Sequence, residues 1–185
     1  MATEWLTQRQ RDGGVDPIRL PAELPGRLWL CGKHAIGAGQ WAEPAMSQAT
    51  VVCLCERHEL AERYPAYVAW LDRHAPDGER ALWFPIHDLH APPIDRMLPF
   101  VDRLVDALRA GRELVVHCGA GIGRAGTTAV CVLLRLGLDR DDALVVVAAA
   151  RPGAGPEAGA QRLLVDLVSA RQHEVPNRLP HGDPV

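Results

Sequence analysis

The chain of 185 residues is long enough to bury a sizeable core and fits one domain. Hydrophobic residues make up 48 % of it and charged residues 23 %, proportions that are usual for soluble globular proteins. The net charge of −3 argues against a broad basic surface for nucleic acid or for an anionic membrane, but it allows a small, locally positive pocket. We therefore expect neither nucleic acid nor a membrane as a partner.

The first half of the chain predicts strands around one helix. The expected elements, in chain order, are a flexible amino-terminal lead-in (1–25), two strands (26–30 and 50–55), a helix (59–74) and a third strand (80–86). The lead-in is polar and rich in proline and glycine, whereas the strands are short apolar or alternating runs. Pro65 falls inside the helix and is expected to delay or kink its start.

The second half predicts more helix than strand. The expected elements here are an amphipathic helix (94–110), a strand (113–117), a glycine-rich loop (118–123), three further helices (125–136, 140–150 and 157–173) and a flexible tail (174–185). Strands that alternate with helices are typical of a parallel sheet. We therefore predict a single α/β domain over residues 26–173, with a short, largely parallel central sheet flanked by helices.

The cysteines indicate a reducing environment. There are five, an odd number whose spacing fits no disulfide framework. The first residues contain no apolar segment typical of a signal peptide, and no apolar run approaches the length of a membrane span. We therefore expect a cytoplasmic setting, in which free thiols persist. Cys53 and Cys55 have no second pair at ligand spacing, so we expect no metal and no cofactor.

A strand, a tight loop and a helix meet at Cys118. Three glycines among the six residues from 118 to 123 allow the backbone to fold with its N–H groups pointing inward. Such a loop at the start of a helix binds an oxyanion, and the guanidinium of Arg124 can add two charge-assisted bonds to a phosphate. The candidate phosphate-binding residues are Gly119, Ala120, Gly121, Ile122, Gly123 and Arg124.

The same positive field is expected to stabilise a thiolate at Cys118. A free cysteine titrates near ~8.5, whereas cysteines at helix N-termini beside cations titrate at roughly 3.5–7.5. We therefore predict that the pKa of Cys118 is lowered and that its sulfur is an activated nucleophile.

The motif His117-Cys118-x5-Arg124 resembles the HCx5R signature of the protein tyrosine phosphatase superfamily, and in particular of its small dual-specificity branch. The preceding strand, the glycines and the following helix also fit, and the resemblance extends from about Gly26 to about Ser169. It implies a dual-specificity-phosphatase-like fold and a cysteine-dependent reaction in two steps. The Cys118 thiolate attacks phosphorus to form a cysteinyl-phosphate, which water then hydrolyses without a metal.

The resemblance also implies a general acid on a separate loop. Asp88 is the best candidate, because it lies 30 residues before Cys118 and directly after a predicted strand. His87, His90 and Asp95 are the substitutes. A group in this role typically contributes ~10²–10⁴ in rate.

Two further residues are candidates for supporting roles. His117 either holds the loop or packs at the end of its strand. Gln161 lies where the branch often has a glutamine that helps to place water, but a glutamine on the surface of a helix is an equally good reading.

One position departs from the family pattern. The residue after the arginine is usually Ser or Thr, whose hydroxyl eases breakdown of the phospho-enzyme, and here it is Ala125. The hydroxyls of Thr127 and Thr128 follow, but in the first turns of a helix they are expected to bond the backbone. We therefore expect a slowed second step. An alternative is a catalytically weak module that binds phosphorylated partners.

A rival pattern, Gly121-x-Gly123-x-x-Gly126, fits the dinucleotide fingerprint GxGxxG. Its context is wrong, because no acidic residue ends a following strand about 20 positions on. We therefore set it aside.

The short chain favours a shallow pocket that admits phosphoserine and phosphothreonine as well as phosphotyrosine. Gly119 and Ile122 carry no charge, which argues against a multiply phosphorylated inositol. The expected substrate is thus a phosphorylated protein or a small phosphomonoester; the sequence makes no prediction of an oligomeric state.

Overall fold

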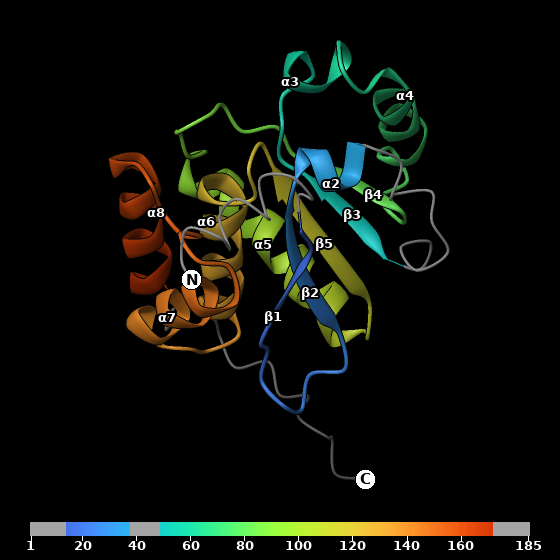
Figure 1. The fold of residues 1–185 in the computed structure, drawn as a ribbon. Coiled ribbons are helices and arrows are strands. Elements are labelled where there is room, and N and C mark those ends of the chain that lie inside the picture. Colours follow the sequence, from blue (N-terminus) through green and yellow to red (C-terminus); the bar gives the residue numbers. More distant parts are fainter. Residues whose placement is uncertain (1–13, 38–48, 172–185) are drawn as a thin grey trace, which may run out of the picture.

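The computed structural model describes residues 14–37 and 49–171. A five-stranded sheet with the order β1-β2-β5-β3-β4 lies at its centre (Figure 1). The strands are β1 (Asp16–Ile18), β2 (Arg27–Gly32), β3 (Thr50–Cys53), β4 (Ala81–Trp83) and β5 (Glu113–Cys118). β1 is antiparallel to β2, and all other neighbouring strands are parallel. The predicted α/β fold with a largely parallel sheet is therefore confirmed.

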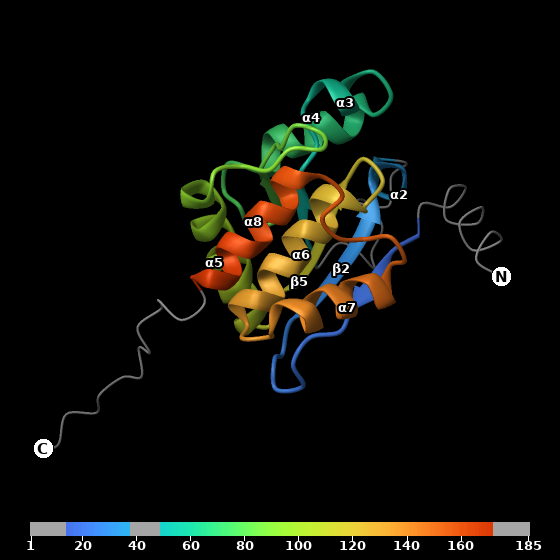
Figure 2. The same ribbon diagram turned by 90° about the vertical axis from the view of Figure 1, so that its left-hand side faces the viewer.

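Helices cover both faces of this sheet (Figures 1 and 2). They are α2 (Lys33–Gly37), α3 (His58–Ala61), α4 (Pro65–His74), α5 (Ile94–Arg109), α6 (Gly123–Arg135), α7 (Arg140–Ala150) and α8 (Gly159–Ala170). Leu114 and Val116 of β5 belong to the core under α5 to α8, whereas Val115 belongs to the core under α2 to α4. Burial on both faces explains why the strands read as continuous apolar runs.

The central strand β5 leads through a short loop into α6, which is enclosed by α5, α7 and α8 (Figure 2). The helix is buried from Gly123 to Leu134. A side chain at Gly126 would collide with the backbone nitrogen of Gly155, so this glycine permits close packing of α6 against the 151–155 loop. The loop between β5 and α6 is therefore anchored at both ends in the core.

The lead-in differs from the expectation. Residues 16–18, which we assigned to a flexible segment, form β1 and pair with β2. Arg151 Nη1 lies 2.5 Å from the Asp16 carboxylate and fixes this strand to the loop after α7. The pattern was not visible in the sequence because β1 has three residues, includes Pro17 and lies at the edge of the sheet.

Helix boundaries also differ from the expected ones. The single helix expected over 59–74 is two helices, since α3 ends at Ala61 and α4 starts at Pro65. Pro65 is the first residue of its helix, where a missing N–H is no loss. The last helix begins at Gly159 rather than at 157. None of the helices in residues 14–37 and 49–171 combines the length and apolar character needed to cross a membrane.

Candidate active site

Cys118 is the last residue of β5, between β2 and β3 in the sheet, and is 3 % exposed. The backbone N–H groups of Ala125 and Gly121 donate hydrogen bonds to its sulfur. Ala125 lies in the first turn of α6, where backbone N–H groups have no partner within the helix. The sulfur thus faces donors from both the loop and the helix start.

Gly121 sets the shape of this loop. Its φ is +76°, a conformation that favours glycine. A side chain at this position would collide with the carbonyl group of Cys31 on β2. The backbone of the loop at Gly121 therefore packs directly against the backbone of β2.

The expected drop in the pKa of Cys118 does not occur. Burial raises the pKa of this thiol, while the N–H of Ala125, the charge of Arg124 and the N–H of Gly121 act in the opposite direction without overcoming it. The nearby thiol of Cys55 adds to the increase. The sequence prediction was wrong because it counted the donors and left out the cost of removing the sulfur from water.

Arg124 lies beside the loop with its guanidinium almost fully buried. Nη1 and Nη2 lie 2.6 and 2.8 Å from the two carboxylate oxygens of Glu59, and Nη1 donates to the carbonyl oxygen of Ile86 at 2.9 Å. Burial by itself would lower the pKa of Arg124, but the bonds to Glu59 outweigh it and the pKa is raised. The guanidinium is therefore held in one orientation and stays charged.

Glu59 is a site residue that the sequence analysis missed. Besides Arg124, it accepts a hydrogen bond from the backbone N–H of Glu56 at 2.8 Å. Burial would raise the pKa of Glu59, yet the bonds from Arg124 and Glu56 lower it overall. One signal could have indicated it: a buried arginine needs a carboxylate partner. Glu56 and Glu59 follow β3, the strand next to Cys118.

Asp88 lies on the loop after β4, and its Oδ1 is 3.1 Å from Arg124 Nη2. Its side chain is 68 % exposed and is thus open to solvent. Among the substitutes, the His87 ring bonds Glu56 at 2.8 Å and the His90 ring bonds the Asp88 carbonyl at 2.7 Å. Asp95 is at the start of α5 and pairs with Arg171. Of the four acid candidates, Asp88 is the one that contacts the arginine of the motif.

Gln161 is 1 % exposed, so the reading of a surface helical residue is wrong. Its Oε1 accepts the backbone N–H of Glu157 at 2.8 Å and lies 3.5 Å from the Thr127 hydroxyl. Its Nε2 donates to the carbonyl oxygen of His90 at 3.4 Å. Gln161 therefore joins α6, α8 and the Asp88 loop.

The hydroxyls near Ala125 have partners away from the sulfur. Thr128 Oγ1 donates to the carbonyl oxygen of Arg124 at 2.9 Å, as expected, whereas the Thr127 hydroxyl faces Gln161. His117 is fully buried, and its Nε2 lies 2.6 Å from the Tyr67 hydroxyl. His117 thus ties the base of the loop to α4.

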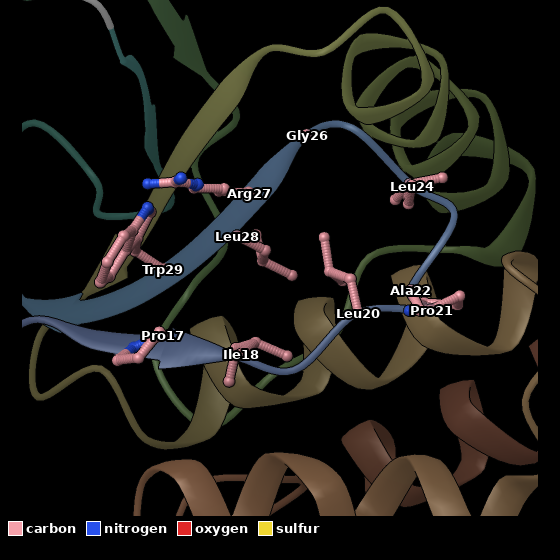
Figure 3. Close-up of a pocket in the computed structure, with 10 residues that line it drawn as sticks. All are labelled: Pro17, Ile18, Leu20, Pro21, Ala22, Leu24, Gly26, Arg27, Leu28 and Trp29. Carbon is pink, nitrogen blue, oxygen red and sulfur yellow. The ribbon is translucent and has the colours of Figure 1, made fainter.

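The cavity in Figure 3 is not part of this site. It has a volume of about 380 Å³ and is lined mainly by apolar residues between β1 and β2. Arg27, which lines it, is paired in register with Glu113 at the start of β5, whereas Cys118 ends that strand. The cavity therefore lies toward the opposite end of the sheet. Within residues 14–37 and 49–171, no three His, Cys, Asp or Glu side chains are grouped to hold a metal ion.

Residues 25–171 match the family model described as PTP-SAK, the Swiss Army Knife protein DSP-PTPase phosphatase domain. The chain belongs to this family. The resemblance to dual-specificity phosphatases is thus confirmed. The PTP-SAK match also covers the segment that carries the dinucleotide-like glycine pattern. The last glycine of the dinucleotide pattern, Gly126, lies in α6 and permits close packing against Gly155.

Solved structures share the fold of this PTP-SAK domain. Tk-PTP in its active form is 27 % identical, with a TM-score of 0.60 over 79 % of this chain and 92 % of its own. Human DUSP28 is 21 % identical, with a TM-score of 0.61 over 85 % and 95 %. PTPMT1 in complex with PI(5)P is 13 % identical, with a TM-score of 0.59 over 80 % and 92 %.

Proposed function

We propose that the chain hydrolyses phosphomonoesters through a cysteinyl-phosphate intermediate, with Cys118 as the nucleophile. One observation carries the proposal: the Cys118 sulfur and the guanidinium of Arg124 are held at the same loop, the sulfur by backbone N–H groups and the guanidinium by Glu59. A phosphate bound between them would meet donors that are already oriented. Preorganised donors of this kind stabilise the charge of a transition state.

In the proposed first step, the backbone N–H groups of residues 119–124 and the guanidinium of Arg124 bind the phosphoryl oxygens. The Cys118 thiolate attacks phosphorus, the sulfur–phosphorus bond forms, and the bond to the ester oxygen breaks. Asp88 gives its proton to that leaving oxygen. Its carboxyl group, open to solvent and 3.1 Å from Arg124, supports this role.

The thiolate must form before the attack. The pKa of Cys118 is raised by burial, so only a fraction of the enzyme is in the reactive form at neutral pH. The N–H groups of Ala125 and Gly121 and the charge of Arg124 limit this increase. We therefore expect the attack by sulfur to become faster as pH rises and the Cys118 thiolate forms.

In the proposed second step, water attacks phosphorus and the sulfur leaves. The Asp88 carboxylate accepts the proton of that water, and Gln161 helps to place it. Ala125 supplies an N–H to the sulfur but no hydroxyl, so the leaving thiolate is less well stabilised than in relatives with Ser or Thr there. This supports a second step that is slow relative to the first.

For the substrate we propose phosphotyrosine proteins, with phosphoserine and phosphothreonine also accepted. The family description names a dual-specificity-type domain, and human DUSP28 shares the fold. The five cysteines are free and buried, which supports our proposal of a reducing, cytoplasmic setting.

A second candidate function is a phosphate-binding module with little turnover, which Ala125 favours. Trapping separates the two. Acid quenching of the protein with a ³²P-labelled aryl phosphate should leave label on Cys118, and Cys118→Ser should remove it. Retained binding of vanadate without covalent label or product release would instead support the binding module.

A further inference from the structure

Lys33 is the only lysine of the chain, and it lies next to the phosphate loop. It follows Gly32, which pairs in register with Cys118 across β2 and β5. Its backbone N–H donates to the carbonyl oxygen of Gly119 at 3.1 Å. Both α2 and α3 lie at the end of the sheet where β2 and β5 terminate (Figure 1). The lysine is therefore at the level of the first loop residue.

The side chain of Lys33 reaches toward the residue that holds Arg124. Nζ donates to the backbone carbonyl oxygen of Glu59 at 3.1 Å. Both carboxylate oxygens of Glu59 are bonded to Arg124 instead. An ammonium has three donors, and this contact uses one. Within the described part of the chain, the positive charge of Lys33 thus has no carboxylate bonded to it.

Arg63 is a second cation near α2, the helix that begins with Lys33. The guanidinium of Arg63 lies 5.7 Å from the ring of Tyr64, whose hydroxyl is 2.5 Å from His34 Nδ1. His34 follows Lys33 on α2. Burial lowers the pKa of His34, and the charges of Arg63 and Lys33 lower it further. Arg63 and Lys33 thus both lie close enough to His34 for their charges to act on it.

The charges inside the site are balanced in a different way. Arg124 faces two carboxylates, those of Glu59 and Asp88. Two carboxylates thus contact the loop arginine, whereas within residues 14–37 and 49–171 no carboxylate is bonded to Lys33 or to Arg63. An anionic group beside the scissile phosphate would therefore be attracted mainly by the charges of Lys33 and Arg63.

We propose that Lys33 and Arg63 form a subsite for a second anionic group of the substrate, a carboxylate or a phosphate close to the phosphate that is hydrolysed. This inference rests on the proposed function and narrows its substrate class. A phosphoprotein substrate would carry acidic residues beside the phosphorylated one. A small substrate would carry a second phosphate.

Two matched pairs of substrates test the subsite. One pair is a phosphotyrosine peptide with two flanking glutamates and the same peptide with two glutamines. The other is phenyl phosphate and benzene-1,3-diyl bisphosphate. The ratio of kcat/KM within each pair measures the preference for the second charge, and the two pairs distinguish a carboxylate from a phosphate as its source.

The enzymes compared are the wild type, Lys33→Met, Lys33→Arg, Arg63→Gln and Arg27→Gln. Arg27→Gln is the matched control, because it removes one exposed positive charge at the opposite end of β2. We expect the wild type to prefer the charged member of at least one pair by about fivefold to tenfold, as a charge-assisted contact gives. Lys33→Met should bring the ratio to about one for the peptides and to about two for the bisphosphate, whose two equivalent phosphates double the rate statistically. Arg63→Gln should reduce the ratio, and Lys33→Arg and Arg27→Gln should keep it.

Equal ratios for wild type and Lys33→Met would overturn the subsite even though hydrolysis itself proceeds. If the wild type hydrolyses none of these substrates, the proposed function fails. The subsite is then tested by calorimetric Kd values for the same peptide pair, with the same expected ratios. A charge preference that is weakened by NaCl in the wild type and absent in Lys33→Met supports the electrostatic origin.

Discussion

Glu59 and Arg124 are 65 residues apart in sequence, yet their carboxylate and guanidinium meet through two bonds of 2.6 and 2.8 Å. This pair fixes the arginine at the edge of the phosphate loop. It also explains why a cation can be buried next to Cys118 at all, since an unpaired buried charge is expensive.

Replacing Glu59 should weaken both folding and activity. Glu59→Gln keeps the shape of the side chain but leaves Arg124 with the exposed Asp88 as its carboxylate partner. We expect a loss of about 2 kcal/mol in the free energy of unfolding, less than the ~3–5 kcal/mol of a fully buried pair, because solvent reaches Glu59. Urea unfolding measures it, and kcat/KM should fall by about tenfold or more.

The exposed pair of Arg57 and Asp72 is the control for this change. Asp72→Asn should leave unfolding and activity unaltered, because exposed ion pairs contribute little. Similar losses for both variants would show that Glu59 has no special role.

The reactivity of Cys118 should rise with pH. The folded state raises its pKa, so the thiol predominates at neutral pH and the thiolate forms above the usual value of ~8.5. The rate of iodoacetamide labelling, taken as wild type minus Cys118→Ser, should therefore have its midpoint above that value. A midpoint below neutral pH would contradict the raised pKa and would support the lowered pKa that we predicted from the sequence.

The raised pKa of Cys118 also predicts how the free energy of unfolding changes with pH. A group whose pKa is raised by folding stabilises the protein below the unfolded pKa, and this contribution is lost as pH rises through the folded pKa. Cys118→Ser should therefore reduce the fall in unfolding free energy between pH 8 and pH 10. An identical slope in both proteins would contradict the assignment.

Ala125→Ser should speed the second step. The N–H of residue 125 already bonds the sulfur, so a hydroxyl on the same residue starts close to the leaving thiolate. We expect a burst of product in the wild type, and a smaller burst with about tenfold faster steady turnover in the variant. Rapid-quench kinetics measure both. Steady turnover that is unchanged by the hydroxyl would show that Ala125 does not limit the rate.

Gly121→Ala should disrupt the loop. Gly121 has a φ of +76°, and a side chain there would collide with the carbonyl group of Cys31. Gly153 has a φ of +85° but open space around it, so Gly153→Ala tests backbone strain alone. We expect about 1 kcal/mol of destabilisation for Gly153→Ala and at least twice that for Gly121→Ala, with loss of activity in the latter. Equal thermal shifts would argue against the collision.

Local patterns sufficed to predict much of the fold. The strands around Val52 and Val115 are buried on both faces and therefore read as continuous apolar runs. Cys118, the glycines and Arg124 are adjacent in sequence, so their loop was visible as one motif. Asp88 was found by its spacing, and its place beside Arg124 agrees with that choice while its role stays a prediction.

Long-range contacts accounted for what the sequence did not reveal. Glu59 meets Arg124 only through the fold, and Lys33 reaches Gly119 only because β2 and β5 are in register. The pKa of Cys118 depends on burial by surrounding elements rather than on its loop. The burial of Gln161 also results from packing between elements, and no sequence pattern around this residue indicated it.

The most direct test of the central claim is the hydrolysis of p-nitrophenyl phosphate by wild type, Cys118→Ser and Asp88→Ala in the presence of EDTA. The account predicts turnover by the wild type despite the chelator, none by Cys118→Ser, and a loss of about 10²-fold or more for Asp88→Ala. Hydrolysis that persists in Cys118→Ser, or a wild type without activity, would contradict the cysteinyl-phosphate mechanism.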